Sequence, residues 1–415
     1  MARKQREVLV LGAGIVGVST ALALQQRGHA VTLVDRKMPG LETSYGNAGI
    51  IQREAVQPYA FPRAIGMLLR VATGRSNEAR YHMGALWHLW PRLLQYWHSS
   101  APSNYAAIAQ AYSRLIEKCI GEHAFWIEQA GAGELVHREG WRQVYRSRQA
   151  FDSAASDATA VARWHGLGCS VLDSGELASA EPALQLPLAG AIHWTDPWTV
   201  RDPGDLVARY ARLFVLRGGR FALGDAMTLR QHGPGWSVDA EGRSVQAEDA
   251  VIALGPWADA LTRALGYRLP LFIKRGYHRH YEGHSGLSLP MLDTERGVML
   301  APMSRGLRIT TGAEFARQDA ASTPVQLRRA EHSTRELVPL GKPIEVSPWL
   351  GSRPCTVDMK PVLGPAPRHK GLWFNFGHAH QGFTLGPVTG RILAELISGE
   401  PPFIHPAPYL ASRFG

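Results

Sequence analysis

Cysteine is scarce in this chain of 415 residues, and its scarcity excludes two kinds of site. The three cysteines, Cys119, Cys169 and Cys355, are far apart in the sequence. A disulfide framework needs more of them, and a C-x-x-C redox or zinc motif needs two that are close together. We therefore expect a protein of a reducing compartment, without a disulfide scaffold or a local metal site.

Long apolar runs are missing as well. No stretch of about twenty uncharged apolar residues occurs, so we expect no transmembrane helix. The basic N-terminus and the apolar residues after it resemble a signal peptide, but Gly12, Gly14 and Gly17 interrupt the apolar run. Export is therefore not expected, and we place the protein in the cytoplasm.

The basic residues do not form a block, although 45 of them against 35 acidic residues give a formal net charge of +10. Clustered basic residues would indicate nucleic-acid binding, whereas dispersed ones favour a positive surface that attracts anionic small molecules. We expect no nucleic-acid partner. Internal repeats and low-complexity tracts are also absent, and the length and the 45% hydrophobic content suit a globular enzyme of two domains.

The N-terminal stretch "EVLVLGAGIVGVSTALALQQRGHAVTLVDR", residues 7–36, has the pattern of a strand, a glycine turn, a helix and a second strand. Gly12 permits the tight turn, Gly14 lets the backbone approach a pyrophosphate, and Gly17 lets the helix pack close to the strand. The glycines alone could mark an ordinary tight connection. Because strand and helix patterns flank them in the required order, we predict a dinucleotide site.

The end of the second strand indicates which dinucleotide binds there. Asp35 follows the apolar run 30–34, where its carboxylate can accept a hydrogen bond from a ribose hydroxyl and would repel a 2′-phosphate. The backbone N–H groups at the start of the helix, around Ile15 and Val16, are free to bind phosphate. NADP is therefore disfavoured.

Later segments return to this sheet and add a second one. Residues 249–254 predict another buried strand, with a turn at Gly255 and a helix from about Trp257. Residues 269–315 predict an antiparallel sheet. Apolar residues at 86, 89, 93, 96 and 97 predict a helix whose apolar side is mostly core, with a break at Pro91.

Four further segments resemble the FAD-dependent D-amino-acid oxidase superfamily, above all its bacterial D-amino-acid dehydrogenase and glycine or sarcosine oxidase branches. They are "TSYGNAG" (43–49), "VIALGPWADAL" (251–261), "GSRPCTVDMKPVLGP" (351–365) and "GHAHQGFTLGPVTGRILAELISG" (377–399). With the N-terminal motif, the resemblance covers residues 7–399. It implies a mixed α/β fold. A Rossmann-like FAD-binding domain would comprise residues 1–80, 160–268 and 345–415, and a discontinuous antiparallel-sheet substrate domain would comprise residues 81–159 and 269–344.

The resemblance also implies which residues bind FAD. Adenosine would lie at the end of the second strand, the pyrophosphate over the glycine turn, and the flavin beneath the loop 44–49, with the N-terminus of a helix 386–398 pointing at its pyrimidine ring. The implied cofactor residues are Gly12, Gly14, Ile15, Val16, Gly17, Asp35, Arg36, Ser44, Asn47, Ala48, Gly49, Gly255, Gly382, Phe383 and Thr384. Some sarcosine oxidases bind flavin through a cysteine, but Cys355 is not at the corresponding position, so we expect non-covalent FAD.

For the substrate, the resemblance implies that Arg353 holds a carboxylate, because a guanidinium binds that group through two parallel hydrogen bonds. Tyr277 would share the carboxylate. Of His280 and Tyr281, alternation along a strand allows only one to face the substrate. The catalytic candidates are therefore Arg353, Tyr277 and His280.

The expected reaction is oxidative deamination of a D-amino acid to a 2-oxo acid and ammonia, with hydride transfer to flavin N5. Oxidation of a secondary amine such as sarcosine or a D-proline derivative is an open alternative, and a tRNA-associated flavoprotein is a weaker one. For the electrons we expect a quinone as acceptor, with oxygen as the alternative. Because tryptophans, arginines and apolar residues are mixed in residues 61–97, we also expect peripheral contact with the inner face of the cytoplasmic membrane.

Overall fold

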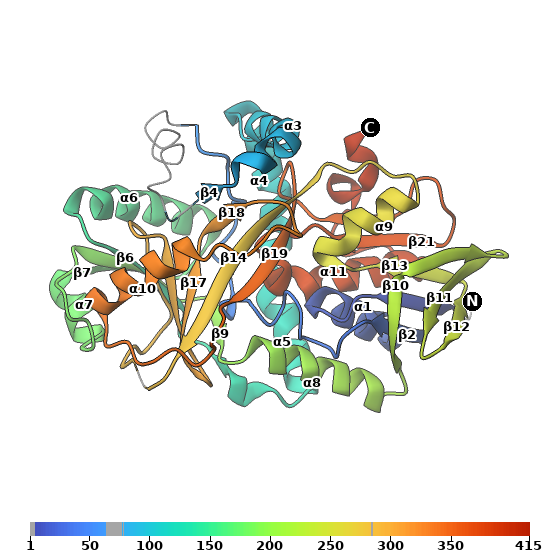
Figure 1. Ribbon diagram of the computed structural model, residues 1–415, viewed down its shortest axis with the longest axis horizontal. Coiled ribbons are helices and arrows are strands. Elements are labelled where there is room, and N and C mark those ends of the chain that lie inside the picture. The colour runs from blue at the N-terminus through green and yellow to red at the C-terminus, as the bar shows by residue number, and fades with distance from the viewer. Residues whose placement is uncertain (1–4, 64–76, 78, 284) are drawn as a thin grey trace.

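A computed structural model of the protein describes residues 5–63, 77, 79–283 and 285–415. Figure 1 shows two lobes, each built on a large sheet, with the long strands β14 (Leu271–Tyr281) and β19 (Trp349–Thr356) running between them. Helices cover both lobes. The mixed α/β fold class predicted from the sequence is confirmed.

The first lobe contains an eight-stranded sheet in the order β12-β11-β10-β2-β1-β13-β21-β20. Its strands are β1 (Glu7–Leu11), β2 (Ala30–Asp35), β10 (Arg220–His232), β11 (Gly235–Ala240), β12 (Arg243–Ala247), β13 (Asp249–Ile252), β20 (Val362–Pro365) and β21 (Leu372–Phe376). The strand predicted at 249–254 is β13, two residues shorter, and it pairs in parallel with β1. Since β1, β2 and β13 are parallel, their carboxyl ends meet at one edge of the sheet.

The second lobe contains a larger sheet in the order β4-β18-β14-β17-β16-β15-β6-β8-β7, with β19 also paired to β14. Its other strands are β4 (Ala79–Tyr81), β6 (Trp141–Tyr145), β7 (Cys169–Asp173), β8 (Gly190–Trp194), β15 (Met291–Asp293), β16 (Val298–Met303), β17 (Gly306–Thr311) and β18 (Ala313–Phe315). A small third sheet joins β3 (Ile50–Ile51), β9 (Trp198–Val200) and β5 (Val136–His137).

Two of the expected domain boundaries differ from the sheet pairing. Residues 160–194 were assigned to the nucleotide domain, but β8 pairs with both β6 and β7 in the second sheet and lies between them. Residues 345–356 were assigned to the same domain, but β19 pairs with β14 over eight residue pairs. The second lobe therefore takes strands from three separate segments of the chain.

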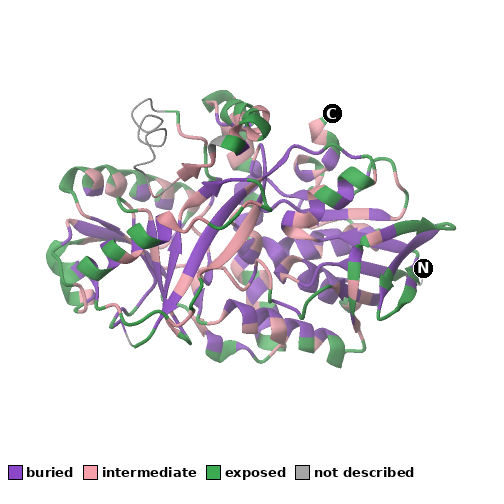
Figure 2. Cartoon of the chain, viewed as in Figure 1, coloured by how far each residue is buried: buried purple, intermediate pink, exposed green. Residues whose placement is uncertain are grey.

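The helices of the first lobe pack on its sheet or, in the case of α5, on other helices of the lobe. These are α1 (Ile15–Gln26), α5 (Cys119–Gln129), α8 (Pro203–Leu216), α9 (Ala258–Ala264) and α11 (Gly382–Ile397). The other helices are α3 (Met83–Ser99), α4 (Pro102–Ile116), α6 (Arg148–His165), α7 (Ser174–Ala180) and α10 (Val325–Leu337). Figure 2 shows that the strands are mostly buried while the outer helices are exposed on one side. No helix in the described ranges is both long and apolar enough to cross a bilayer.

The predicted break at Pro91 is wrong, because α3 continues through that residue to Ser99. A proline removes one backbone hydrogen bond inside a helix. Trp87 and Trp90, on the turn before Pro91, are 82% and 54% exposed, so water can reach this part of the helix. The expectation of a mostly buried apolar stripe is also only partly met, since Tyr96 is buried and Trp97 is 39% exposed.

Candidate functional site

A cavity of about 630 Å³ extends from the carboxyl edge of the first sheet to the strands β14 and β19. That volume is within the range of small-molecule and cofactor sites. Gly12 and Asp35 line one end, and Lys274 and Arg353 line the other. Residues predicted to bind a dinucleotide and residues predicted to bind a substrate therefore share one cavity.

The glycine turn after β1 has the geometry that its sequence predicts. Gly12 has a φ of +108°, and a Cβ there would lie 2.5 Å from the carbonyl oxygen of Ala253. A Cβ on Gly17 would lie 1.7 Å from the carbonyl oxygen of Gly12, so any larger residue would separate helix from turn. Gly14 is the N-cap of α1 and provides no side-chain cap. The Ile15 N–H donates to Ser44 Oγ at 3.0 Å, which ties the helix start to the loop 43–49.

Asp35 and Arg36 line the end of the cavity that is predicted to bind adenosine. The Asp35 carboxylate accepts a hydrogen bond from the backbone N–H of Ala13 at 2.6 Å, and burial raises its pKa. Each carboxylate oxygen has a second lone pair that can accept from a ribose hydroxyl. The Arg36 guanidinium lies 4.2 Å from the ring centre of Trp257 and pairs with Glu42. The planar Arg36 guanidinium and the Trp257 ring form a flat wall at this end of the cavity.

The loop 43–49 lies between the two lobes and is held from behind by Arg308. The Arg308 guanidinium donates to the backbone carbonyls of Tyr45 and Asn47 and to His280 Nε2, and burial lowers its pKa to about 10. His280 Nδ1 in turn bonds Glu345 at 2.7 Å. Ser44, Asn47 and Ala48 line the cavity. Gly49, with a φ of +74°, does not line it, but a Cβ there would lie 2.2 Å from Val200 O.

Helix α11 begins at Gly382, four residues before the predicted start at Gly386. Pro387 follows this missed first turn and has no N–H for the carbonyl of Phe383. Instead, His123 Nε2 donates to that carbonyl at 2.9 Å, and burial lowers the pKa of His123 to about 4. Gly382 and Phe383 line the cavity, so the uncapped N-terminus of α11 faces it.

Two residues predicted to bind the cofactor, Thr384 and Gly17, do not line the cavity. Thr384 donates its hydroxyl hydrogen to Gln381 Oε1 and accepts from the Gln52 N–H, so it fixes the helix start. Gly17 serves packing, as described above. Gly255, in contrast, lines the cavity with a φ of +53° and open space where a Cβ would lie.

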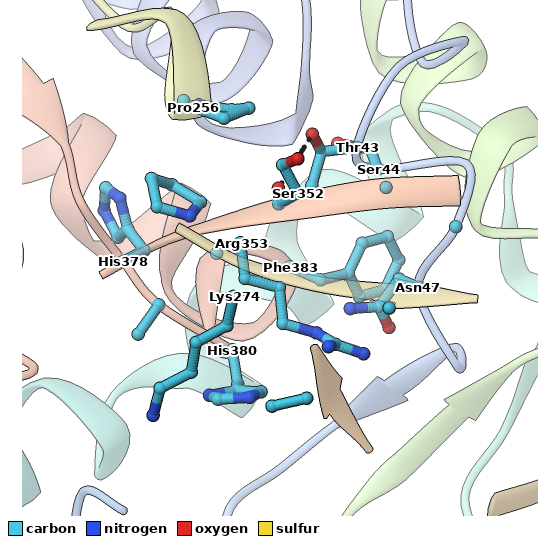
Figure 3. A pocket seen from close by; sticks show the side chains of 18 of the residues that line it. Thr43, Ser44, Asn47, Pro256, Lys274, Ser352, Arg353, His378, His380 and Phe383 are labelled. Carbon is cyan, nitrogen blue, oxygen red and sulfur yellow. Dashed lines mark hydrogen bonds between the residues drawn. The ribbon is translucent and has the colours of Figure 1, made fainter. Parts of the chain in front are cut away.

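Arg353 projects from β19 into the cavity (Figure 3). Its guanidinium donates to the backbone carbonyls of Arg275, Gly312 and Thr311 at 3.3 to 3.5 Å, which are long hydrogen bonds. A Cβ on Gly276 would lie 2.5 Å from the guanidinium, so the glycine leaves the room that Arg353 occupies. Burial lowers the pKa of Arg353, and no salt bridge to it occurs among the described residues.

Tyr277 does not reach the cavity, contrary to the prediction. Its hydroxyl donates to Glu314 at 2.9 Å and accepts from the Thr323 N–H and the Arg275 guanidinium. Successive residues of a strand face opposite sides, and on β14 the cavity side carries Lys274 and Gly276. Tyr277 therefore lies in a buried polar cluster behind the sheet.

His280 does not line the cavity either, because its ring is held between Glu345 and Arg308. It supports the loop 43–49 through Arg308 and does not contact the substrate space. Tyr281 is also behind the sheet, where its hydroxyl bonds Glu331. Of the three catalytic candidates, only Arg353 lies in the cavity.

Several cavity residues were missed by the sequence analysis. Lys274, Tyr59, His380 and Trp349 all line the cavity. Trp349 lies between Gly46 and Gly351, because a Cβ on either glycine would be 1.9 Å from its ring. Lys274 could have been found from the alternation on β14, since it shares the face of Gly276.

Comparison with known proteins gives one family over nearly the whole chain. The sequence model of the FAD dependent oxidoreductase family (DAO) matches residues 7–396. A D-amino acid dehydrogenase of Paramagnetospirillum magneticum is 32% identical over 95% of this chain and 96% of its own. A D-amino-acid oxidase of Bradyrhizobium diazoefficiens is 30% identical over 99% of both chains. The crystal structure of glycine oxidase from Geobacillus kaustophilus is similar in fold, with a TM-score of 0.72 at 22% identity over 99% of both chains.

The cavity fits FAD, the cofactor of this family. An extended dinucleotide needs a hydrogen-bond acceptor for its ribose, N–H groups for its phosphates and backbone without side chains where it passes closely. Asp35, the start of α1, and the open turn at Gly255 provide these in one cavity. The N-terminus of α11 would stabilise negative charge on the flavin. Cys355 is fully buried, and it does not belong to the cavity lining.

Proposed function

The chain belongs to the FAD dependent oxidoreductase family, and on that basis we propose that it oxidises a D-amino acid at the bond between Cα and nitrogen. Bound FAD would accept a hydride from Cα, while the nitrogen loses a proton and becomes an imine. Water then hydrolyses the imine to a 2-oxo acid and ammonia. The D-amino acid dehydrogenase and D-amino-acid oxidase names of the two relatives support this choice.

Arg353 is the observation that carries the proposal. It is a guanidinium in the cavity whose hydrogen bonds, within the described part of the chain, go only to three backbone carbonyls, at distances that leave them weak. An arginine without an acidic partner matches a carboxylate in both geometry and charge. Bound there, an amino acid has its Cα held in one orientation, and orientation of this kind contributes more to the rate than a single acid or base.

We further propose that the electrons pass to a quinone and that the protein docks on an anionic membrane through α3. One side of this helix exposes Trp87, Trp90, Leu94 and Trp97, which follow at intervals of three and four residues. The Arg63 guanidinium lies 4.0 Å from the ring centre of Trp97. Figure 1 shows α3 on the outside of the molecule. The rest of the predicted contact segment, residues 64–76, lies outside the described residues.

Charge and composition support this docking surface. Tryptophan and arginine side chains combine an apolar body with a polar end, as a membrane interface requires. The formal net charge of +10 would draw the protein to an anionic inner leaflet. The protein would then be cytoplasmic with reversible contact to the inner membrane.

Anaerobic mixing of the FAD-loaded protein with single amino acids tests the reaction. We expect D-amino acids to bleach the flavin absorbance and their L-enantiomers to leave it unchanged. N-methyl and cyclic amines in the same series distinguish oxidation of secondary amines. Absence of bleaching by every D-amino acid would contradict the proposal.

A further inference from the structure

Two cations project into the substrate end of the cavity from directly opposed positions. Lys274 on β14 and Arg353 on β19 are register partners in the antiparallel pair, and both line the cavity. Opposed residues of this kind have Cβ atoms about 4.5 to 5.5 Å apart, and like charges there destabilise a sheet. Burial lowers the pKa of both groups, and the charge of Arg353 lowers the pKa of Lys274 further. The pKa of His380, between them, is lowered by burial and by both positive charges.

Strand β14 carries a second buried cation, Arg275, with which Lys274 can be compared. Arg275, the next residue after Lys274, faces the other side of the sheet and pairs with Glu314 at 2.7 Å, with both side chains fully buried. Lys274 is 5% exposed and forms no salt bridge with any described residue. An unpaired buried ammonium is costly unless another charge reaches it. Arg275 is thus compensated within the protein, whereas Lys274 is not.

The surroundings of Lys274 provide aromatic surface and one hydrogen bond. Its Nζ lies 4.6 Å from the ring centre of Tyr96 and 5.7 Å from those of Phe272 and Phe315. It donates to Tyr96 Oη at 3.3 Å, while that hydroxyl donates its own hydrogen to the Tyr59 carbonyl. One of the three ammonium hydrogens is therefore used within the protein.

Acidic residues in the cavity lining are all at its other end. They are Asp35, Glu42 and Asp225, on or beside β2 and β10. The walls near Lys274 include Phe61, Tyr81 and Phe315, which offer apolar contact to a short carbon chain. Among the described residues, the substrate end is therefore positively charged and partly apolar, and no carboxylate lines it.

We propose that Lys274 binds a second carboxylate of the substrate, so that the preferred substrates are D-amino acids with an acidic side chain, of the aspartate or glutamate class. This proposal rests on the proposed oxidation of D-amino acids, in which Arg353 holds the α-carboxylate. In Figure 3 the side chains of Lys274 and Arg353 extend in different directions, and their charged ends lie on either side of His380. Their separation favours two anion positions over a shared hold on one carboxylate.

The test compares acids with their amides of nearly equal shape. FAD-loaded protein is reduced anaerobically with D-aspartate against D-asparagine, and with D-glutamate against D-glutamine. A hydrogen-bonded ion pair predicts a preference of about ten- to a hundredfold in reduction efficiency for the better acid over its amide. In Lys274→Met that ratio should fall to about one. Lys342→Met, which removes the same charge from an exposed loop, should keep the ratio of the unsubstituted protein.

Two results would overturn the inference while the proposed oxidation stands. One is that an amide reduces the flavin as efficiently as the corresponding acid. The other is a preference for the acid that persists in Lys274→Met, or a loss of efficiency there that is equal for acid and amide. An equal loss of efficiency for acid and amide would indicate that Lys274 is needed for folding or binds the α-carboxylate.

Binding without turnover provides a readout that does not depend on the reaction. Glutarate and butyrate have similar chains but two carboxylates and one, and both can be titrated against the flavin absorbance of the loaded protein. We expect glutarate to bind at least tenfold more tightly, and Lys274→Met to remove the difference. If no amino acid reduces the flavin, the proposed oxidation fails, and this titration still decides the role of Lys274. Equal dissociation constants for the two acids would contradict it.

Discussion

At the scale of single residues, the decisive feature is a buried arginine that has no acidic partner among the residues the structure describes. Arg353 donates hydrogen bonds to backbone carbonyls there, in space that Gly276 leaves free. A lysine at the same place could keep the charge but not the two parallel donors that fit a carboxylate. The planar shape of the group should therefore matter as well as its sign.

We predict that Arg353→Lys lowers kcat/KM with the best substrate by about ten- to a hundredfold. That range corresponds to roughly 1.5 to 3 kcal/mol for a hydrogen bond to a charged group. Steady-state kinetics provides the measurement, and Arg243→Lys, on exposed β12, is the control that should behave as the unsubstituted protein. Unchanged kinetics in Arg353→Lys would remove the arginine from the substrate site.

Arg353 and the glycine turn could be predicted from the sequence as cavity residues, because both belong to short local patterns. It misassigned Tyr277, because a tyrosine that lies in a pocket and one that bonds a buried Glu314 look alike in a strand. The alternation of β14 contained the missing information, since Gly276 must face the bulky Arg353. Only the pairing of β14 with β19, distant in sequence, shows which face that is.

At the scale of elements, α1 and α11, whose N-termini are predicted to bind the cofactor, pack against each other. A Cβ on Gly390 would lie 2.8 Å from the backbone N of Thr20, and one on Gly386 would lie 3.1 Å from the Ile15 side chain. The two helices are therefore in close backbone contact. Their spacing positions both N-termini at the cavity.

We predict that Gly390→Ala destabilises the protein by roughly 1 to 3 kcal/mol, the range for an added methyl in a packed interior. Thermal unfolding with and without FAD would measure the effect. Gly121→Ala in α5 is the matched control, because its Cβ would meet nothing within 4 Å. In Gly121→Ala, the free energy of unfolding should be unchanged or higher by up to about 1 kcal/mol. Equal stability of the two variants would show that the helices can separate without cost.

Element boundaries were predicted less well than element types. The start of α11 was missed because proline is favoured at the first position of a helix, which sets the start next to Pro387. The donor that replaces the missing N–H of Pro387 comes from His123, more than 250 residues away. The assignment of β7 and β8 failed because neither strand has a local signal for which sheet it joins. Long-range partners decide both features.

At the scale of the whole molecule, the exposed side of α3 is the clearest apolar surface near the substrate lobe. Trp87 is 82% exposed and Trp90 is 54% exposed, on a protein with an excess of positive charge. These features suit a surface that meets anionic lipid. Under the proposal, electrons would pass to a membrane quinone while this helix rests on the lipid.

We predict that the protein sediments with anionic liposomes at low salt and is released at high salt. The double variant Trp87→Ser, Trp90→Ser should lose most of this binding. Trp164→Ser is the control, because Trp164 is 85% exposed on α6, away from the docking surface. In parallel, reduced flavin should be reoxidised faster by a soluble quinone than by oxygen. Fast oxygen reaction without liposome binding would instead make the protein an oxidase with no membrane contact.

The central claim is that the cavity joins an FAD site to an arginine that holds the substrate α-carboxylate. Stopped-flow reduction of the bound FAD by the best D-amino acid and by its α-amide tests this most directly, because the two differ only in the group that Arg353 would bind. We predict that the α-amide reduces the flavin at least about tenfold less efficiently. Equal efficiency of the two compounds would contradict the claim.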